Sequence, residues 1–294
     1  MAGEAIAHEL RSPLDPRFVE RLSPLIENLP MCSTALRSGT GNLELSALVT
    51  KGVTAMSKEN IVSSDLSEPA EVGKVDETGV LGFHRHMHET FRATETGTEV
   101  EYLGKTFVVH RNVFWPGEDS KALVMNYVVN SGEEVLDLCT GAGPVAVFSA
   151  YMGARSVLAV DINPDAVENA RSNAAHHGFS RIIEARQSDM FSAVESDRKF
   201  DVITMNPPFI DHPADDIVSS STWDEALHVH KEFFANAPDR LKTQGRSYIA
   251  EANYGTIREM QRLARSAGFS VREIGRHKKP YTDLIFYAYE LRLA

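Results

Sequence analysis

The tetrapeptide Asn206-Pro207-Pro208-Phe209 has the residue types for one particular kind of chemistry. The side-chain oxygen of Asn206 and the backbone carbonyl of Pro207 are two acceptors that can bind the two hydrogens of a planar NH₂ group. Proline rings stiffen the backbone at this point, and Phe209 offers a flat face for stacking. The tetrapeptide therefore predicts a catalytic corner that holds an amide or aromatic amine and aims its nitrogen at an electrophile.

A second motif, residues 137–143 (Asp-Leu-Cys-Thr-Gly-Ala-Gly), lies between a predicted strand and a predicted helix. Small residues in such a turn let the backbone approach a ligand, and open α/β sheets bind nucleotides there. The pattern Gly141-x-Gly143-x-x-Ala146 also fits the dinucleotide fingerprint, with Asp161 placed to hold a ribose. An NAD(P)-dependent oxidoreductase is therefore an alternative at this point.

Acidic residues at three predicted strand ends favour S-adenosylmethionine as the cofactor. Asp137 can meet the methionine ammonium, and Asp161 can take both ribose hydroxyls. Asp189, with Ser188 before it, can accept from the adenine amine. The predicted cofactor-binding residues are Asp137, Cys139, Thr140, Gly141, Gly143, Asp161, Asn163, Ser188, Asp189 and Asn206.

The elements that must position these residues alternate along the chain. Strands are predicted at 135–138, 156–160, 182–187, 200–205, 247–251, 271–275 and 284–291, and helices up to about 152 and at 163–178, 225–237 and 256–268. Such alternation predicts a mostly parallel sheet covered on both faces. Only a few residues around 278–281 join the last two strands, so these must be antiparallel. The expected fold is α/β, a Rossmann-like seven-stranded sheet with the last strand antiparallel, as in class I methyltransferases.

Helix boundaries can also be predicted from capping residues. Asn163 followed by Pro164 is a strong helix start. Thr256 and Glu259 form a potential capping box. Farther upstream, residues 100–110 resemble a hairpin, and Asp119 or Ser120 is expected to cap the helix that follows.

The sequence resembles a known family through these motifs. Asn206-Pro207-Pro208-Phe209 resembles the [Asn/Asp]-Pro-Pro-[Phe/Tyr] motif of amino-group methyltransferases. Together with the loop 137–143 it resembles the HemK-type protein glutamine N-methyltransferases and their relatives. The resemblance implies an S-adenosylmethionine-dependent N-methyltransferase whose acceptor is a protein glutamine or a small-molecule or peptide nitrogen. An RNA base amine is the alternative acceptor, and a non-enzymatic module that only binds the cofactor is a third reading.

The resemblance covers residues 97–294, which are expected to hold an opening hairpin and the methyltransferase domain. Residues 1–96 are predicted to be a mainly helical substrate-recognition or cap region, with helices at 16–28 and 83–93 and a loop at 63–82. The segment 210–224 is expected to shape the substrate pocket. The predicted substrate-binding residues are Phe114, Trp115, Phe209 and Trp223.

Composition narrows the partners. The net charge of −11 disfavours general nucleic-acid binding, which relies on Lys and Arg. The two cysteines, Cys32 and Cys139, have no metal or disulfide spacing, and no metal is expected. No segment is apolar enough for a membrane, and a cytoplasmic location is predicted. His84 and His88 share a helix face that is expected to be solvated or to face substrate.

Overall fold

The computed structural model describes residues 77–293. All of them belong to one compact unit of the chain, Glu71–Ala294. The helix predicted at 16–28, Cys32 and most of the loop predicted at 63–82 lie outside the described residues.

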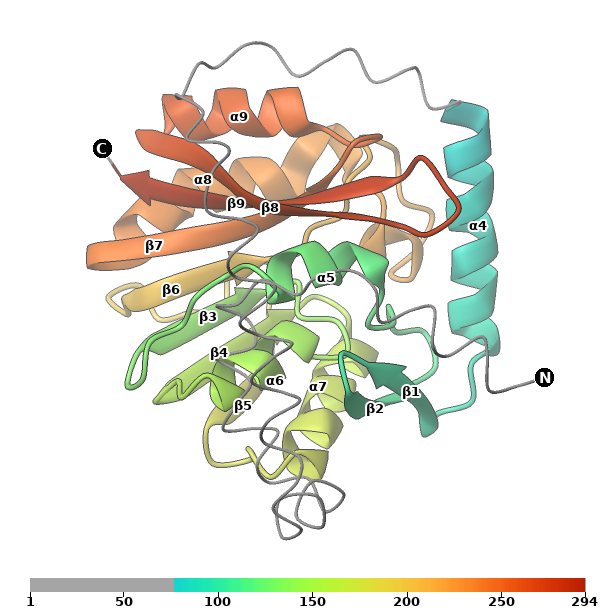
Figure 1. Ribbon diagram of the computed structural model, residues 1–294, viewed down its shortest axis with the longest axis horizontal. Coiled ribbons are helices and arrows are strands. Elements are labelled where there is room, and N and C mark those ends of the chain that lie inside the picture. Colours follow the sequence, from blue (N-terminus) through green and yellow to red (C-terminus); the bar gives the residue numbers. More distant parts are fainter. Residues whose placement is uncertain (1–76, 294) are drawn as a thin grey trace, which may run out of the picture. The chain divides into compact units, whose positions relative to one another are not determined.

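A seven-stranded sheet forms the centre of the fold (Figure 1). Its strands, in spatial order, are β5 (Ile183–Gln187), β4 (Ser156–Asp161), β3 (Glu134–Leu138), β6 (Phe200–Met205), β7 (Leu241–Ala252), β9 (Ile285–Leu293) and β8 (Phe269–Lys278). Neighbouring strands from β5 to β7 are parallel, and β9 is antiparallel to both β7 and β8. The predicted fold is confirmed, because the connection between β8 and β9 is too short for a parallel crossover.

Helices cover both faces of the sheet. One face packs against α5 (Glu118–Val124), α6 (Pro144–Tyr151) and α7 (Pro164–His176), and the other against α8 (His228–Arg240) and α9 (Ile257–Ser266). Successive strand residues point to opposite faces, so Val135 joins the first core and Leu136 the second. The strands are therefore apolar on both sides and end abruptly in the polar loops that form the site.

The predicted hairpin is present as β1 (Thr98–Tyr102) and β2 (Lys105–Val109). Two fully buried asparagines on α7 attach it to the rest of the domain. The side chain of Asn173 bonds to the backbone N–H and carbonyl of Val108, and Asn169 bonds to Val108 and to the N–H of His110. These bonds fix the direction in which the chain leaves β2 toward the carboxyl edge of the sheet.

Two predicted helix caps are wrong and one is confirmed. Asn163 caps α7 by accepting from the backbone N–H of Asp165. The residue at the start of α5 is Gly117, without a side-chain bond, and Asp119 lies buried inside the helix instead. Thr256 precedes α9 but makes no capping bond, because Glu259 pairs with Arg262.

Two other segments differ from the prediction. The helix α4 (Glu77–Ala93) starts earlier than expected, so the end of the loop predicted at 63–82 is helical. The helix predicted at 225–237 is a short 3₁₀ turn, Glu225–Leu227, followed by α8. Ala226 and Leu227 both have positive φ, which interrupts a regular helix. A second 3₁₀ turn, Ser219–Ser221, lies in the preceding segment.

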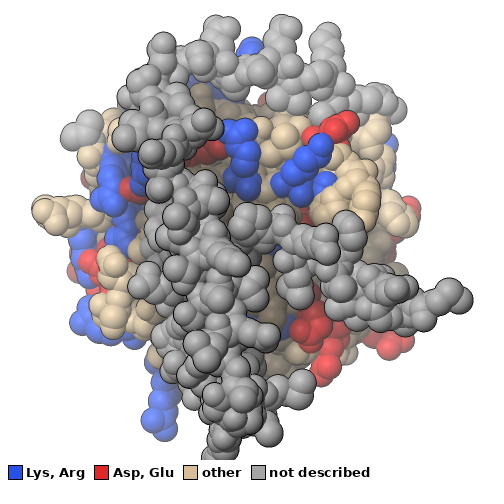
Figure 2. All heavy atoms as spheres, in the orientation of Figure 1, with Lys and Arg blue, Asp and Glu red and all other residues tan. Residues whose placement is uncertain are grey.

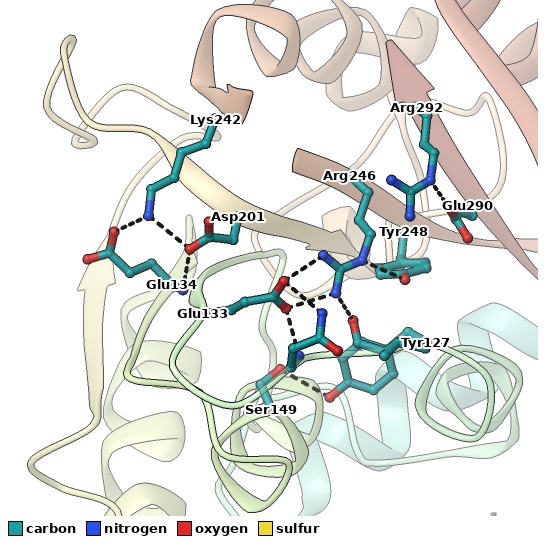
Figure 3. Close-up of polar contacts among 12 residues, drawn as sticks. Tyr127, Glu133, Glu134, Ser149, Asp201, Lys242, Arg246, Tyr248, Glu290 and Arg292 are labelled. Carbon is teal, nitrogen blue, oxygen red and sulfur yellow. Dashed lines mark hydrogen bonds and ion pairs between the residues drawn. The ribbon is translucent and has the colours of Figure 1, made fainter. Parts of the chain in front are cut away.

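Ion pairs join the amino ends of the central strands (Figure 3). Arg246 on β7 binds both carboxylate oxygens of Glu133, each at 2.8 Å, and the carbonyl of Val128 at 2.7 Å. Lys242 bonds to Glu134 at 2.5 Å and to Asp201 at 2.8 Å. We call these five charged residues the amino-end cluster.

Candidate active site

A cavity of about 890 Å³ opens at the carboxyl edge of the sheet. Its walls come from the loops that follow β3, β4, β5 and β6, from the segment 114–120 and from α4. The chain from 214 to 226 forms a further wall, as the prediction for the segment 210–224 anticipated. The volume is in the range of small-molecule and cofactor sites.

Asn206 has an unequal environment on its two amide atoms. Its Nδ2 donates to Oδ2 of Asp119 at 2.7 Å, whereas its Oδ1 is buried and has no hydrogen-bond partner among the described residues. Burial raises the pKa of Asp119, and the bond from Asn206 acts in the opposite direction by favouring the carboxylate. A carboxylate only accepts, so it turns the amide nitrogen toward itself and leaves the oxygen available as an acceptor.

The other residues of the tetrapeptide are buried and closely backed. Phe209 packs against Tyr254 and Phe286, with ring centroids 6.2 Å away in each case. A Cβ on Gly255 would lie 2.8 Å from the carbonyl oxygen of Phe209, so only glycine lets the two segments pass this closely. This close contact, which the sequence did not indicate, holds the corner in place.

The glycine loop is tied to the end of β4 by one carboxylate. Asp161 accepts from the backbone N–H of Gly141 at 2.8 Å and from that of Asn163 at 2.9 Å. Each carboxylate oxygen still has a further lone pair, and Asp161 lines the cavity. Gly143 has a φ of +83° and would place a Cβ 3.2 Å from Ala170, so it serves the packing of α6 on α7 and is not a wall residue.

Asp137 lies beneath the loop and does not line the cavity. Its oxygens accept from the hydroxyl of Thr140 at 2.6 Å and from that of Thr204 at 2.8 Å. Burial raises its pKa to about 6, partly offset by these bonds. The structure thus shows Asp137 holding the loop, and its contact with a ligand ammonium stays a prediction.

The remaining predicted cofactor residues line the cavity. They are Cys139, Thr140, Asn163, Ser188 and Asp189. Ser188 is committed to its own turn, where its hydroxyl donates to the carbonyl of Met190 and accepts from the N–H of Ala193. Asp189 is exposed, and His228 lies 3.6 Å from its carboxylate. Asp189 therefore keeps acceptor capacity toward a ligand.

Aromatic residues form much of the wall. The predicted substrate residues Phe114, Trp115, Phe209 and Trp223 all line the cavity. The sequence prediction missed several others, which are Phe83, His84, Met87, Phe91, Tyr254 and Phe286. Four of these lie on α4 at helical spacing, 83, 84, 87 and 91, a signal that a wider search for amphipathic faces would have found. The solvated interpretation of the His84–His88 face is wrong, since both side chains are only 2% exposed.

A second missed feature is a buried charged group beside the cavity. His230 is completely buried, with Nδ1 2.7 Å from Oδ2 of Asp224 and Nε2 2.8 Å from Oε1 of Glu251. Burial by itself lowers the pKa of His230, but the two carboxylates raise it to about 9. Because Asp224 lines the cavity and Glu251 lies on β7, the imidazole fastens this cavity wall to the sheet.

Two further searches concern the described residues only. Within 77–293, no group of three or more His, Cys, Asp or Glu side chains is arranged to hold a metal ion. No helix in that range has the length and apolar character to cross a membrane.

The sheet order with its antiparallel β9, the glycine loop after β3 and the acids at the next strand ends define a class I S-adenosylmethionine-dependent methyltransferase. Comparison with protein families gives the same result. The family model described as "Methyltransferase small domain" matches residues 105–271, more than half of the chain. The chain belongs to this family, is HemK-like, and uses S-adenosylmethionine. The NAD(P)-dependent alternative is therefore wrong.

Individual relatives are similarly named. The chain is 30% identical over 192 residues to a putative protein N5-glutamine methyltransferase of Methanocaldococcus jannaschii, covering 63% of this chain and 95% of that protein. It is 34% identical over 163 residues to the release factor glutamine methyltransferase of Shewanella oneidensis, covering 53% of this chain and 56% of the relative. Among solved structures, the M. jannaschii tRNA m1G37 methyltransferase aligns over 68% of this chain and 57% of its own, with a TM-score of 0.50 and 19% identity, a likeness of fold alone.

Proposed function

We propose that this enzyme methylates the side-chain amide nitrogen of glutamine in a protein or peptide. The supporting observation is the buried Oδ1 of Asn206, an acceptor without a partner among the described residues, beside an Nδ2 that Asp119 holds. A primary amide brings two N–H groups that need acceptors. The relatives named for glutamine methylation supply the identity of that amide.

Asn206 and Pro207 are the residues proposed to accept the two amide hydrogens. Accepting both hydrogens increases electron density on a nitrogen that is otherwise a poor nucleophile, and it fixes the direction of attack. These bonds lie in a water-poor pocket, where they are stronger than in water. Pro208 keeps the corner rigid and Phe209 packs against the flat amide, so catalysis depends mainly on placement.

The residues around the glycine loop fit S-adenosylmethionine. When bound, this cofactor supplies a methyl group already activated on a sulfonium. Asp161 has lone pairs for the ribose hydroxyls, and Asp189 has an exposed carboxylate for the adenine amine. Gly141 has a φ of +55° and lets the loop backbone line the cavity. Asp137 acts on the same loop through Thr140.

An RNA acceptor is less well supported. The chain carries 41 acidic and 30 basic residues, and RNA binding needs basic side chains gathered along the path of the phosphates. On the face shown in Figure 2, the basic side chains of the described residues lie at separate places with acidic and uncharged residues among them. A protein or peptide acceptor agrees better with this surface and with the aromatic cavity.

The test is methyl transfer from labelled S-adenosylmethionine to a glutamine-containing peptide, with the glutamate version of the peptide as the control. We expect label on the glutamine peptide only, with the added mass on the side-chain amide by fragmentation mass spectrometry. Labelled RNA from a total cell extract, with an unlabelled glutamine peptide, would overturn the proposal in favour of a base amine.

A further inference from the structure

The helix α4 contributes two histidines that are equally buried and differently satisfied. His84 and His88 are one turn apart, and each is 2% exposed. Nε2 of His88 lies 2.7 Å from the hydroxyl of Thr222, so His88 joins α4 to the segment beside the cavity. Nδ1 of His84 is buried and has no hydrogen-bond partner among residues 77–293. An unpartnered buried nitrogen of this kind costs stability unless a ligand satisfies it.

His84 lines the cavity close to the catalytic corner. Its ring meets that of Tyr254 edge-on, with centroids 5.8 Å apart, and Tyr254 in turn contacts Phe209. Trp223 is another wall residue with a buried, unpartnered nitrogen, and it packs against the ring of His88 at 4.8 Å. His84 and Trp223 therefore lie on the α4 side of the cavity that holds Asn206.

The chemistry of these two atoms indicates what they bind. The indole Nε1 of Trp223 is only a donor, whereas Nδ1 of a neutral imidazole either donates or accepts. Burial lowers the pKa of His84 to about 4, with a smaller contribution from His88, so the ring is uncharged near pH 7. A carboxylate or ammonium has no opposite charge to meet here. A peptide group fits, because its carbonyl accepts and its N–H donates.

We propose that His84, together with Trp223, forms a second recognition point of the acceptor site that binds the uncharged peptide group next to the methylated glutamine. This rests on the proposed function. The acceptor is then held at two places, with its side-chain amide at Asn206 and its main chain at α4. The enzyme consequently prefers a glutamine within a peptide to an isolated primary amide.

The experiment compares two probes in wild type and in His84→Phe. Nα-acetyl-L-glutamine N-methylamide has the side-chain amide and flanking peptide groups, and butanamide has the primary amide alone. We expect His84→Phe to raise the KM of the blocked glutamine about 10-fold, the value of one hydrogen bond, with kcat changed less than about 2-fold. His84→Gln, which keeps hydrogen-bonding capacity, should recover most of the loss. The inhibition constant of butanamide, measured as a competitor, should be the same in wild type and in His84→Phe.

His88→Phe is the matched control on the same helix. It should lower the melting temperature, because Thr222 loses its partner, and leave the preference for blocked glutamine over butanamide unchanged. S-adenosylhomocysteine binding by calorimetry verifies that each variant is folded.

Three results would overturn the proposal. An unchanged KM in folded His84→Phe would remove His84 from recognition. Equal losses for both probes would assign His84 to cavity shape alone. No transfer to blocked glutamine by wild type would remove the proposed function itself, and this inference with it.

Discussion

The two ends of the sheet treat buried polar groups in opposite ways. In the amino-end cluster the charged atoms pair with one another, as Arg246 does with Glu133 and Lys242 with Asp201 (Figure 3). At the carboxyl end, Oδ1 of Asn206 and Nδ1 of His84 are buried without a partner among the described residues. A satisfied network contributes to stability, whereas an unsatisfied group is retained where a ligand can complete it.

His230 shows that the carboxyl end is not uniformly unsatisfied. Both of its ring nitrogens are paired, and its partners belong to the cavity wall and to β7. The paired groups at this end therefore fix the walls, and the unpaired ones face the ligand. The following predictions test that division, from the largest expected effect to the smallest.

Asn206→Ala should lower turnover by about 10²–10³, because it removes one preorganised polar contact at the reacting group. Cofactor affinity should change little, since Asp161 and the glycine loop are intact. Single-turnover methyl transfer and calorimetry with S-adenosylhomocysteine measure the two quantities. Wild-type turnover with bound cofactor would exclude Asn206 from the mechanism.

Arg246→Met should destabilise the fold by about 3 kcal/mol, because Glu133 loses both hydrogen bonds in a partly buried place. Burial raises the pKa of Glu133, but the bonds from Arg246 and Asn130 outweigh it and lower the pKa to about 2. Urea unfolding measures the loss. Methyl transfer per folded molecule should equal that of wild type, and a selective loss of activity would show that the two ends are coupled.

His230→Gln should change how stability depends on pH. The pKa of His230 is raised in the folded state, so its contribution is fully present below pH 6.5 and is lost as the pH rises to about 9. Relative to the variant, wild type should lose on the order of 1–2 kcal/mol across that window, given about 1.4 kcal/mol for each unit of pKa shift. Parallel unfolding curves at pH 6 and pH 9 would contradict the assignment of a charged imidazole.

Asp119→Asn should lower kcat about 10-fold, a smaller effect than removal of Asn206. An asparagine at 119 can face Asn206 with either its oxygen or its nitrogen, so the catalytic amide is no longer held in one orientation. Steady-state kinetics with the glutamine peptide measure this. Ser120→Ala, a neighbour on the same helix that is bonded to Tyr102, is the control and should leave kcat unchanged.

Much of the sheet could be predicted from the sequence because its signals are local. Apolar runs of five or six residues, the pair Asn163-Pro164 and the short link before Ile285 each define an element or its direction within a few positions. The two wrong caps, at Asp119 and Thr256, have residue types that suit a helix start. Tertiary contacts decided otherwise, since Asp119 is taken by a residue 87 positions away.

The catalytic tetrapeptide, the glycine loop and the acids at the strand ends were therefore readable from the sequence alone, because each is contiguous and is delivered by a strand. Which amide atom of Asn206 is available, that His84 lines the cavity while His88 joins α4 to Thr222, and that His230 is held between two carboxylates are properties of the tertiary structure. They depend on side chains brought together from distant segments, and a buried hydrogen bond is made or missing only once the core around it has closed.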